Sequence, residues 1–233
     1  MPSNTPTTVA IEPNLLYFGT PVVLISTTNT DGTSNLAPMS SAFWLGWRCM
    51  LGLDASSKTT ENLLRTGECV LNLPSPAQVA NVDRLARLTG TNPVPEGKQM
   101  RKYTHEKHKF ERAGLTPVAS ETIQPPRALE CPVQMEAVHA GTHDLLQDTP
   151  FSGAIKVFEV RIQRVHVHPA IIKDGTNDHI DPDKWNPLIM SFQQFYGLAQ
   201  GKVHTSRLGE IPEEAYRGFT EIERARAVLE AKS

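Results

Sequence analysis

The chain has 233 residues, of which 39% are hydrophobic and 21% charged, and its formal net charge is −2. This length can bury one sizeable core or two small ones, and the near-neutral charge argues against a nucleic acid or a membrane surface as partner, because both attract a basic field. The chain has no long apolar run, its first residues lead us to expect no signal peptide, and its three cysteines are widely spaced. We therefore expect free thiols and a cytoplasmic protein.

The first quarter of the chain predicts a short tail followed by three strands. Residues 1–10 are rich in Thr and Pro and are expected to form a loose tail. A continuous apolar and β-branched run within residues 15–28 predicts a buried strand, and the Asn-Thr-Asp-Gly sequence at 29–32 predicts a hairpin turn. Further strands are predicted over 34–39 and 42–53.

The next segment predicts helices and one strand. A short helix is expected over Lys58 to Thr66, ended by Gly67, and a strand over 68–73. Apolar residues at helical spacing predict a second helix over 77–89. Residues 91–117 are polar and basic, and we interpret them as an excursion over the surface that could serve as a lid.

The remaining chain predicts strands and then a helix. Strands are expected over 122–140 and 154–167, the second because apolar and polar residues alternate. A loop over 174–187 precedes an apolar and aromatic segment at 188–198, and a charged helix is expected from Pro212 to about Ala231. Many strands without a βαβ alternation indicate a barrel.

Two patches of small polar residues could hold a ligand. The patch at 35–41 is extended and contains Pro38, which cannot donate to a strand ladder and therefore marks an edge or break where a ligand can approach. The patch at 54–62 opens a helix, where free N–H groups and the helix dipole favour an anion. A flat ring with a phosphate, such as FMN, suits this pair of patches. A plain solvent-facing loop and N-capping by Ser57 are the alternatives for the two patches.

These segments, together with a stretch at 126–136, resemble the flavin reductase-like family of FMN-binding split barrels, of the flavoredoxin type. The resemblance covers roughly residues 12–200. It implies a mainly β fold with peripheral helices, a six-stranded antiparallel split β-barrel, over residues 11–205. Residues 206–233 would form a C-terminal helical extension, and the protein would be a homodimer that binds FMN non-covalently.

The resemblance also implies which residues contact the flavin. The ring would lie against the first patch, where Pro38 and Met39 form an apolar wall, and the phosphate would lie at the second. The cofactor-binding candidates are Asn35, Ala37, Pro38, Met39, Ser40, Ser41, Asp54, Ser57, Lys58, Thr59, Thr60 and Asn62. No metal site is expected, because neither pair of neighbouring histidines has a Cys, an Asp or a third His at a spacing that would complete a set of metal ligands.

The implied reaction is hydride transfer from NADH or NADPH to FMN, with a flavin-using monooxygenase or another electron acceptor as partner. Many relatives carry Gly-Asp-His near the nicotinamide site, and this chain has Gly141, Thr142 and His143. His143 is thus a candidate neighbour of the nicotinamide, and a surface histidine is the alternative. An FMN oxidase or electron carrier of the same fold, or a non-catalytic flavin-binding module, remains open, as does the choice between NADH and NADPH.

Overall fold

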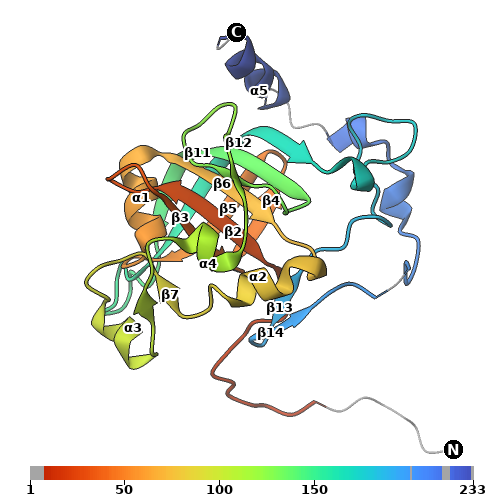
Figure 1. Ribbon diagram of the computed structural model, residues 1–233. Coiled ribbons are helices and arrows are strands. Elements are labelled where there is room, and N and C mark those ends of the chain that lie inside the picture. Colours follow the sequence, from red (N-terminus) through yellow and green to blue (C-terminus); the bar gives the residue numbers. More distant parts are fainter. Residues whose placement is uncertain (1–7, 200, 217–220, 232–233) are drawn as a thin grey trace, which may run out of the picture.

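The computed structural model describes residues 8–199, 201–216 and 221–231. Its main sheet has seven strands, each antiparallel to its neighbours, in the order β3-β2-β6-β11-β12-β5-β4 (Figure 1). The strands are β2 (Val23–Thr28), β3 (Ser34–Met39), β4 (Ala42–Leu45), β5 (Arg48–Asp54), β6 (Glu68–Leu73), β11 (Val133–Asp144) and β12 (Ile155–Val167). The expected mainly β fold is therefore present.

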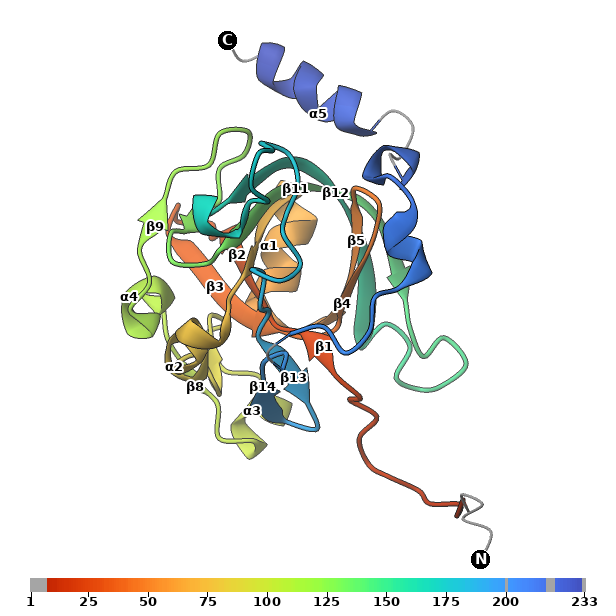
Figure 2. The same ribbon diagram turned by 90° about the vertical axis from the view of Figure 1, so that its right-hand side faces the viewer.

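The sheet is rolled into an open barrel. Its two edge strands, β3 and β4, follow one another in the sequence and are joined by Ser40 and Ser41 alone, so the edges lie close together at this end (Figure 2). The backbone N–H of Gly52 donates to the carbonyl of Ser41 over 2.8 Å. Within the described residues no ladder pairs β3 with β4, so the barrel is split along this seam.

The sheet has seven strands where six were expected, because the predicted single strand over 42–53 is a hairpin. The chain reverses at Gly46, whose φ of +56° is unfavourable for other residues, and β4 pairs with β5. The two polar patches are therefore separated by a folded-back hairpin, which brings them nearer to each other than one extended strand would.

Helix α1 (Lys58–Thr66) confirms the predicted bounds. Ser57 caps its first turn by accepting a hydrogen bond from the N–H of Thr60, and Gly67 ends it at φ 71° with its N–H bonded to Leu63. Leu63 is fully buried in the core inside the barrel. This anchor fixes the N-terminal end of α1 beside β3.

The predicted helix over 77–89 is wrong beyond Asp83. A 3-10 turn, η1 (Pro76–Gln78), leads into α2 (Val79–Asp83), and the chain then turns at Arg87, whose φ is 55°. Leu88–Thr89 forms β7, which pairs in parallel with β8 (Thr104–His105). Backbone pairing with a segment sixteen residues downstream thus replaces the helix that local periodicity favoured.

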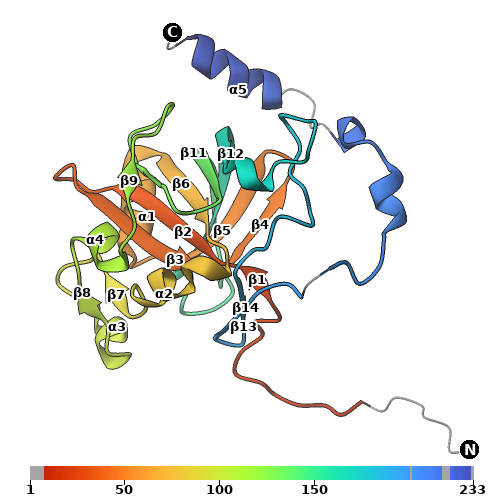
Figure 3. The same ribbon diagram turned by 45° about the vertical axis from the view of Figure 1, so that its right-hand side comes forward.

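The predicted excursion at 91–117 folds back on the barrel. It carries α3 (Glu96–Met100) and α4 (Lys109–Ala113), and α4 packs against β3. Figure 3 shows α3, α4, β7 and β8 gathered on one side, next to β3. Phe110 and Leu115 anchor this segment in an outer core.

Strand β2 lies between two apolar cores, because its successive side chains point to opposite faces of the sheet. Val23 and Ile25 face the core inside the barrel, whereas Leu24, and Val22 just before the strand, face the outer core beneath α2 and α4. The first core also contains Phe158 of β12, which is completely buried. The period of two in the sequence therefore determines both layers.

Short elements complete the described chain. They are β1 (Thr20–Pro21), β9 (Pro117–Val118), β10 (Arg127–Ala128), β13 (Ile189–Ser191), β14 (Gln194–Tyr196), the 3-10 turns η2 (Pro169–Ile171), η3 (Arg207–Glu210) and η4 (Glu213–Tyr216), and α5 (Glu221–Glu230) beside β12. The strand expected over 122–140 starts only at Val133. Of the helix expected from Pro212 to about Ala231, Glu213–Tyr216 form the 3-10 turn η4 and Glu221–Glu230 form α5. Residues 217–220 of that helix lie outside the described residues, as do 232–233 of the expected extension and 1–7 of the predicted tail. No described helix has the length and apolar character that crossing a membrane requires.

Candidate functional site

A groove of about 210 Å³ lies where β3 meets the start of α1. The predicted ligand contacts that line it are Ala37, Pro38, Met39, Asp54, Ser57, Lys58 and Thr59. The opposite wall is formed by residues 85–90 and by the excursion. The structure thus brings both polar patches to one groove, as the pairing of the patches predicted.

The first turn of α1 presents backbone donors to the groove. Ser57 takes the N–H of Thr60 on its side chain and that of Glu61 on its carbonyl. The N–H groups of Lys58 and Thr59 have no hydrogen bond to another described residue, as expected for the first turn of a helix. N-capping by Ser57 and an anion site are therefore compatible at this helix.

The positive charge of the groove does not come mainly from Lys58. The ammonium group of Lys58 forms an ion pair with Glu61 at 2.7 Å. Four other basic side chains line the groove, and sequence reasoning did not assign them to the site. They are Arg87, Lys98, Arg101 and Lys109.

Lys98 and Lys109 are buried, with 8% and 3% of their surface exposed. Lys109 donates to the side-chain oxygen of Asn35 over 3.1 Å. Burial, reinforced by the charge of Lys98, lowers the pKa of Lys109 to about 8, and burial likewise lowers the pKa of Lys98. The sequence signal that could have assigned these two lysines to the site was the run of basic residues at 98–109 next to Phe110, which anchors the run against the barrel.

Asn35 organises the wall of the groove from behind. Its amide nitrogen donates to the hydroxyl oxygens of Thr59 (3.2 Å) and Thr27 (3.3 Å), and its oxygen accepts from Lys109. It does not line the groove itself. Asn35 therefore positions Thr59 and Lys109, and its expected contact with the ring edge stays a prediction.

Glycine at position 90 lets the excursion approach this network. A Cβ atom there would lie 2.7 Å from the side-chain oxygen of Asn35 and 3.0 Å from Cγ of Lys58. The first distance is shorter than real Cβ contacts, and the oxygen of Asn35 is held by Lys109, so a larger residue would force this network to shift. The second distance would require the side chain of Lys58 to move as well.

Several predicted contacts are not brought to the groove. Asn62 is buried, and both its donors are used by Thr27 and Asn29. Thr60 donates to the carbonyl of Asp54. Neither they nor Ser40 and Ser41, which join the two sheet edges, line the groove. The expected contacts of these four residues with a flavin therefore stay predictions that the groove does not support.

His143 lies away from the groove. It is exposed on β11, where it pairs across the ladder with Val157, and it is not among the lining residues. Its neighbour Thr142, where relatives carry an acid, forms a 2.7 Å hydrogen bond with His139. The structure does not support a contact between His143 and the groove.

A larger cavity, of about 380 Å³, lies between β12 and α5. Apolar side chains, among them Trp47, Val165 and Leu229, make up much of its wall. None of the predicted ligand contacts lines it. The groove beside α1 is therefore the better candidate for a polar cofactor.

Comparison with known proteins agrees with the geometry. The model of the flavin reductase like domain matches residues 15–199. The uncharacterized protein YdfE of Bacillus subtilis (strain 168) is 39% identical over 190 residues, which cover 82% of this chain and 89% of that protein.

Two solved structures share the fold. Flavoredoxin of Desulfovibrio vulgaris (Miyazaki F) superposes with a TM-score of 0.68 at 21% identity, over 87% of this chain and 100% of the other. Nitrilotriacetate monooxygenase component B from Bacillus cereus gives 0.66 at 21% identity, over 85% and 99%.

Proposed function

The chain belongs to the flavin reductase-like family, and from this premise we propose that it is an FMN-binding NAD(P)H:flavin oxidoreductase. Membership of the family implies a flavin and a nicotinamide co-substrate. FMN is proposed because the groove combines an apolar strand surface with a cationic end. We propose residues 11–205 as the flavin-binding unit and 206–233 as an extension.

The observation that supports the proposal is the junction of β3 with the start of α1. The ring of the flavin would lie against Ala37, Pro38 and Met39, whose side chains offer no charge to it. Its phosphate would lie toward the free N–H groups of Lys58 and Thr59. The separate sequence patches thereby become the two ends of one ligand site.

The bound flavin supplies the hydride chemistry, and the protein supplies binding, orientation and electrostatics. Residues 37–39 would fix the plane of the ring, and the excursion would shield it from water on the opposite side. No described side chain in the groove is needed as a general acid or base. His143 remains a proposed nicotinamide neighbour that the groove does not support.

We expect the purified protein, loaded with FMN, to show flavin absorbance between roughly 300 and 550 nm that bleaches when NADH or NADPH is added without oxygen. The nucleotide that bleaches faster is the preferred one. Free FMN mixed with each nucleotide is the control. A protein that takes up no flavin would contradict the proposal.

Flavin bands that persist with both nucleotides would favour the alternative functions, an FMN oxidase or electron carrier, or a flavin-binding module. The physiological acceptor is proposed to be a flavin-using monooxygenase or another electron acceptor. The likeness to component B of nitrilotriacetate monooxygenase supports the first of these. The three buried free cysteines are consistent with the proposed cytoplasmic location.

We also propose a homodimer. Edge strand β4 exposes Phe43 and Leu45, at 55% and 72%, and one side of it pairs with no other strand of the described residues. A second copy of the chain would cover this surface. Light scattering after size exclusion should give about twice the 25.7 kDa of one chain, and Leu45→Glu should shift the mass to the monomer. A monomeric wild type would refute this part of the proposal.

A further inference from the structure

The most unusual electrostatic feature of the groove is a pair of buried ammonium groups. Within the described residues, the ammonium group of Lys98 forms no hydrogen bond and no ion pair and is influenced only from a distance by the carboxylate of Asp54. The ammonium group of Lys109 donates to the neutral oxygen of Asn35. Burying a charge without a partner of opposite sign is unfavourable, and such groups are normally paired. The positive charge of the two lysines is not balanced within the described residues, and this points to an anionic ligand.

The rest of the groove supplies too little negative charge to balance the two lysines. Its lining carries five basic side chains and one carboxylate, that of Asp54. The charge of Asp54 acts on both Lys98 and Arg101, it lies 4.0 Å from Arg101, and its side chain also accepts hydrogen bonds from the backbone and hydroxyl of Ser56. The positive charge of Lys98 and Lys109 therefore remains in excess.

The two lysines lie on different elements of the excursion. Lys98 belongs to α3 and Lys109 to α4, and both side chains reach the groove that the start of α1 enters from the other side. A phosphate at the free N–H groups of Lys58 and Thr59 would thus face cations as well as backbone donors. The burial of both lysines and the free helix N-terminus are independent observations.

We infer that Lys98 and Lys109 are specificity-determining residues that select a phosphorylated flavin over a phosphate-free one. The inference rests on the proposed function and adds the residues that read the phosphate. An uncharged ribityl end would leave both ammonium groups buried and unpaired. FMN would neutralise them, and riboflavin would not.

The inference couples ligand binding to pH. Lys109 is more easily deprotonated in the free protein than an exposed lysine, with a pKa of about 8. A bound phosphate dianion raises that pKa, so the complex holds more protons than the free protein above pH 8. The affinity for FMN should therefore be highest below pH 8 and fall as the pH rises through it. The charged or titratable groups around Lys109 are Asp54, Lys58, Arg87, Lys98, Arg101, Tyr103 and Glu106.

The test measures the affinity of the full chain for FMN and for riboflavin, by quenching of flavin fluorescence between pH 7 and about 9.5, with the wild type and three variants. Lys98→Met and Lys109→Met keep the buried hydrocarbon stem and remove the charge. Lys102→Met, at an exposed position of the same excursion outside the groove, is the matched control. Circular dichroism checks that each variant is folded.

Each buried lysine is expected to contribute about tenfold or more to the FMN affinity, and its loss should leave riboflavin within about twofold of the wild type. Lys102→Met should change neither. Lys109→Met should also flatten the pH profile for FMN. Parallel losses for both flavins, or an unchanged ratio of their affinities, would overturn the inference while the flavin proposal stands. A wild type that binds neither flavin would overturn both.

Discussion

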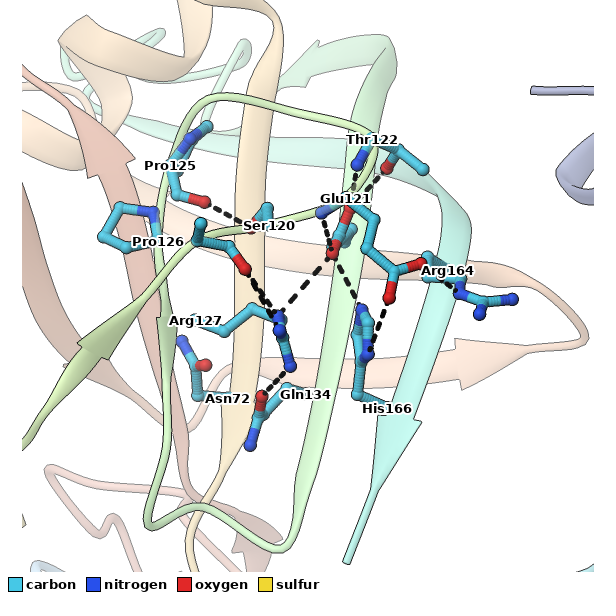
Figure 4. A network of polar contacts seen from close by, with 12 residues as sticks. Asn72, Ser120, Glu121, Thr122, Pro125, Pro126, Arg127, Gln134, Arg164 and His166 are labelled. Carbon is cyan, nitrogen blue, oxygen red and sulfur yellow. Dashed lines mark hydrogen bonds and ion pairs between the residues drawn. The ribbon is translucent and has the colours of Figure 1, made fainter. Parts of the chain in front are cut away.

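Replacing Glu136 by alanine is expected to lower the free energy of unfolding by about 3–5 kcal/mol, because it removes one side of a buried polar network. Glu136 on β11 is completely buried and accepts hydrogen bonds from the backbone N–H groups of Glu121 and Thr122, at 2.8 and 2.6 Å. His166 lies 2.8 Å away and Arg127 3.7 Å away. Figure 4 shows Glu121 and Thr122 on the loop before β10, Arg127 on β10 and His166 on β12 gathered in one network of polar contacts.

Urea unfolding at pH 7 measures this effect, with Glu121→Ala as the control. The side chain of Glu121 is partly exposed and pairs with Arg164 at 2.9 Å, so its loss should cost no more than about 1 kcal/mol. The backbone N–H of residue 121 stays bonded to Glu136 in that variant. An equal decrease in the free energy of unfolding for the two variants would contradict a stabilising role of the buried network.

The same network predicts a pH dependence. Burial alone would raise the pKa of Glu136, but the hydrogen bonds from His166, Thr122 and the backbone outweigh it and lower the pKa from 4.5 to about 2. A lowered carboxyl pKa stabilises the folded state above pH 4.5, and this contribution is lost as the pH falls toward 2. The difference in stability between wild type and Glu136→Ala should therefore shrink across that interval.

Replacing Leu63 by alanine is expected to lower the free energy of unfolding by about 2–5 kcal/mol. The side chain is fully buried among residues of the inner core and holds α1 against the barrel. Its truncation removes apolar burial and leaves a cavity, because the surrounding strands cannot collapse freely. Since α1 provides one end of the groove, this contact also positions the proposed phosphate site.

Leu64 is the matched control on the same helix. It is 52% exposed, so Leu64→Ala makes the same chemical change with little loss of burial. Its effect should lie within about 0.5 kcal/mol. The two variants are compared by urea unfolding, and the comparison requires that their m-values are equal. A loss below about 1 kcal/mol for Leu63→Ala would contradict the assignment of α1 to the inner core.

Local sequence signals were sufficient where the interactions that form an element are themselves local. The capping residues Ser57 and Gly67 lie next to the helix they bound, so α1 was predicted with its observed limits. The alternation within 154–167 likewise predicted β12 to within a residue. The hairpin turn before β3 depended only on Gly32 and its neighbours, and was also confirmed.

Local signals failed where a distant segment competed. The helix expected over 77–89 ended early because Leu88 and Thr89 pair with β8. The strand expected over 42–53 became a hairpin, since β4 finds its partner in β5 and the chain needs a turn at Gly46. Neither the parallel pairing nor the reversal has a strong signature in the sequence.

The sequence by itself determined the family, the mainly β fold, helix α1 and the two ends of the groove, because each depends on residues that are close together in the chain. Only the tertiary structure decided which of those residues face the groove. Asn62 matched the pattern as well as Thr59 did, yet it is turned toward β2 and the hairpin that follows it. Lys98 and Lys109 resembled surface lysines until the excursion folded over β3 and buried them, because the burial of a side chain depends on segments far away in the sequence.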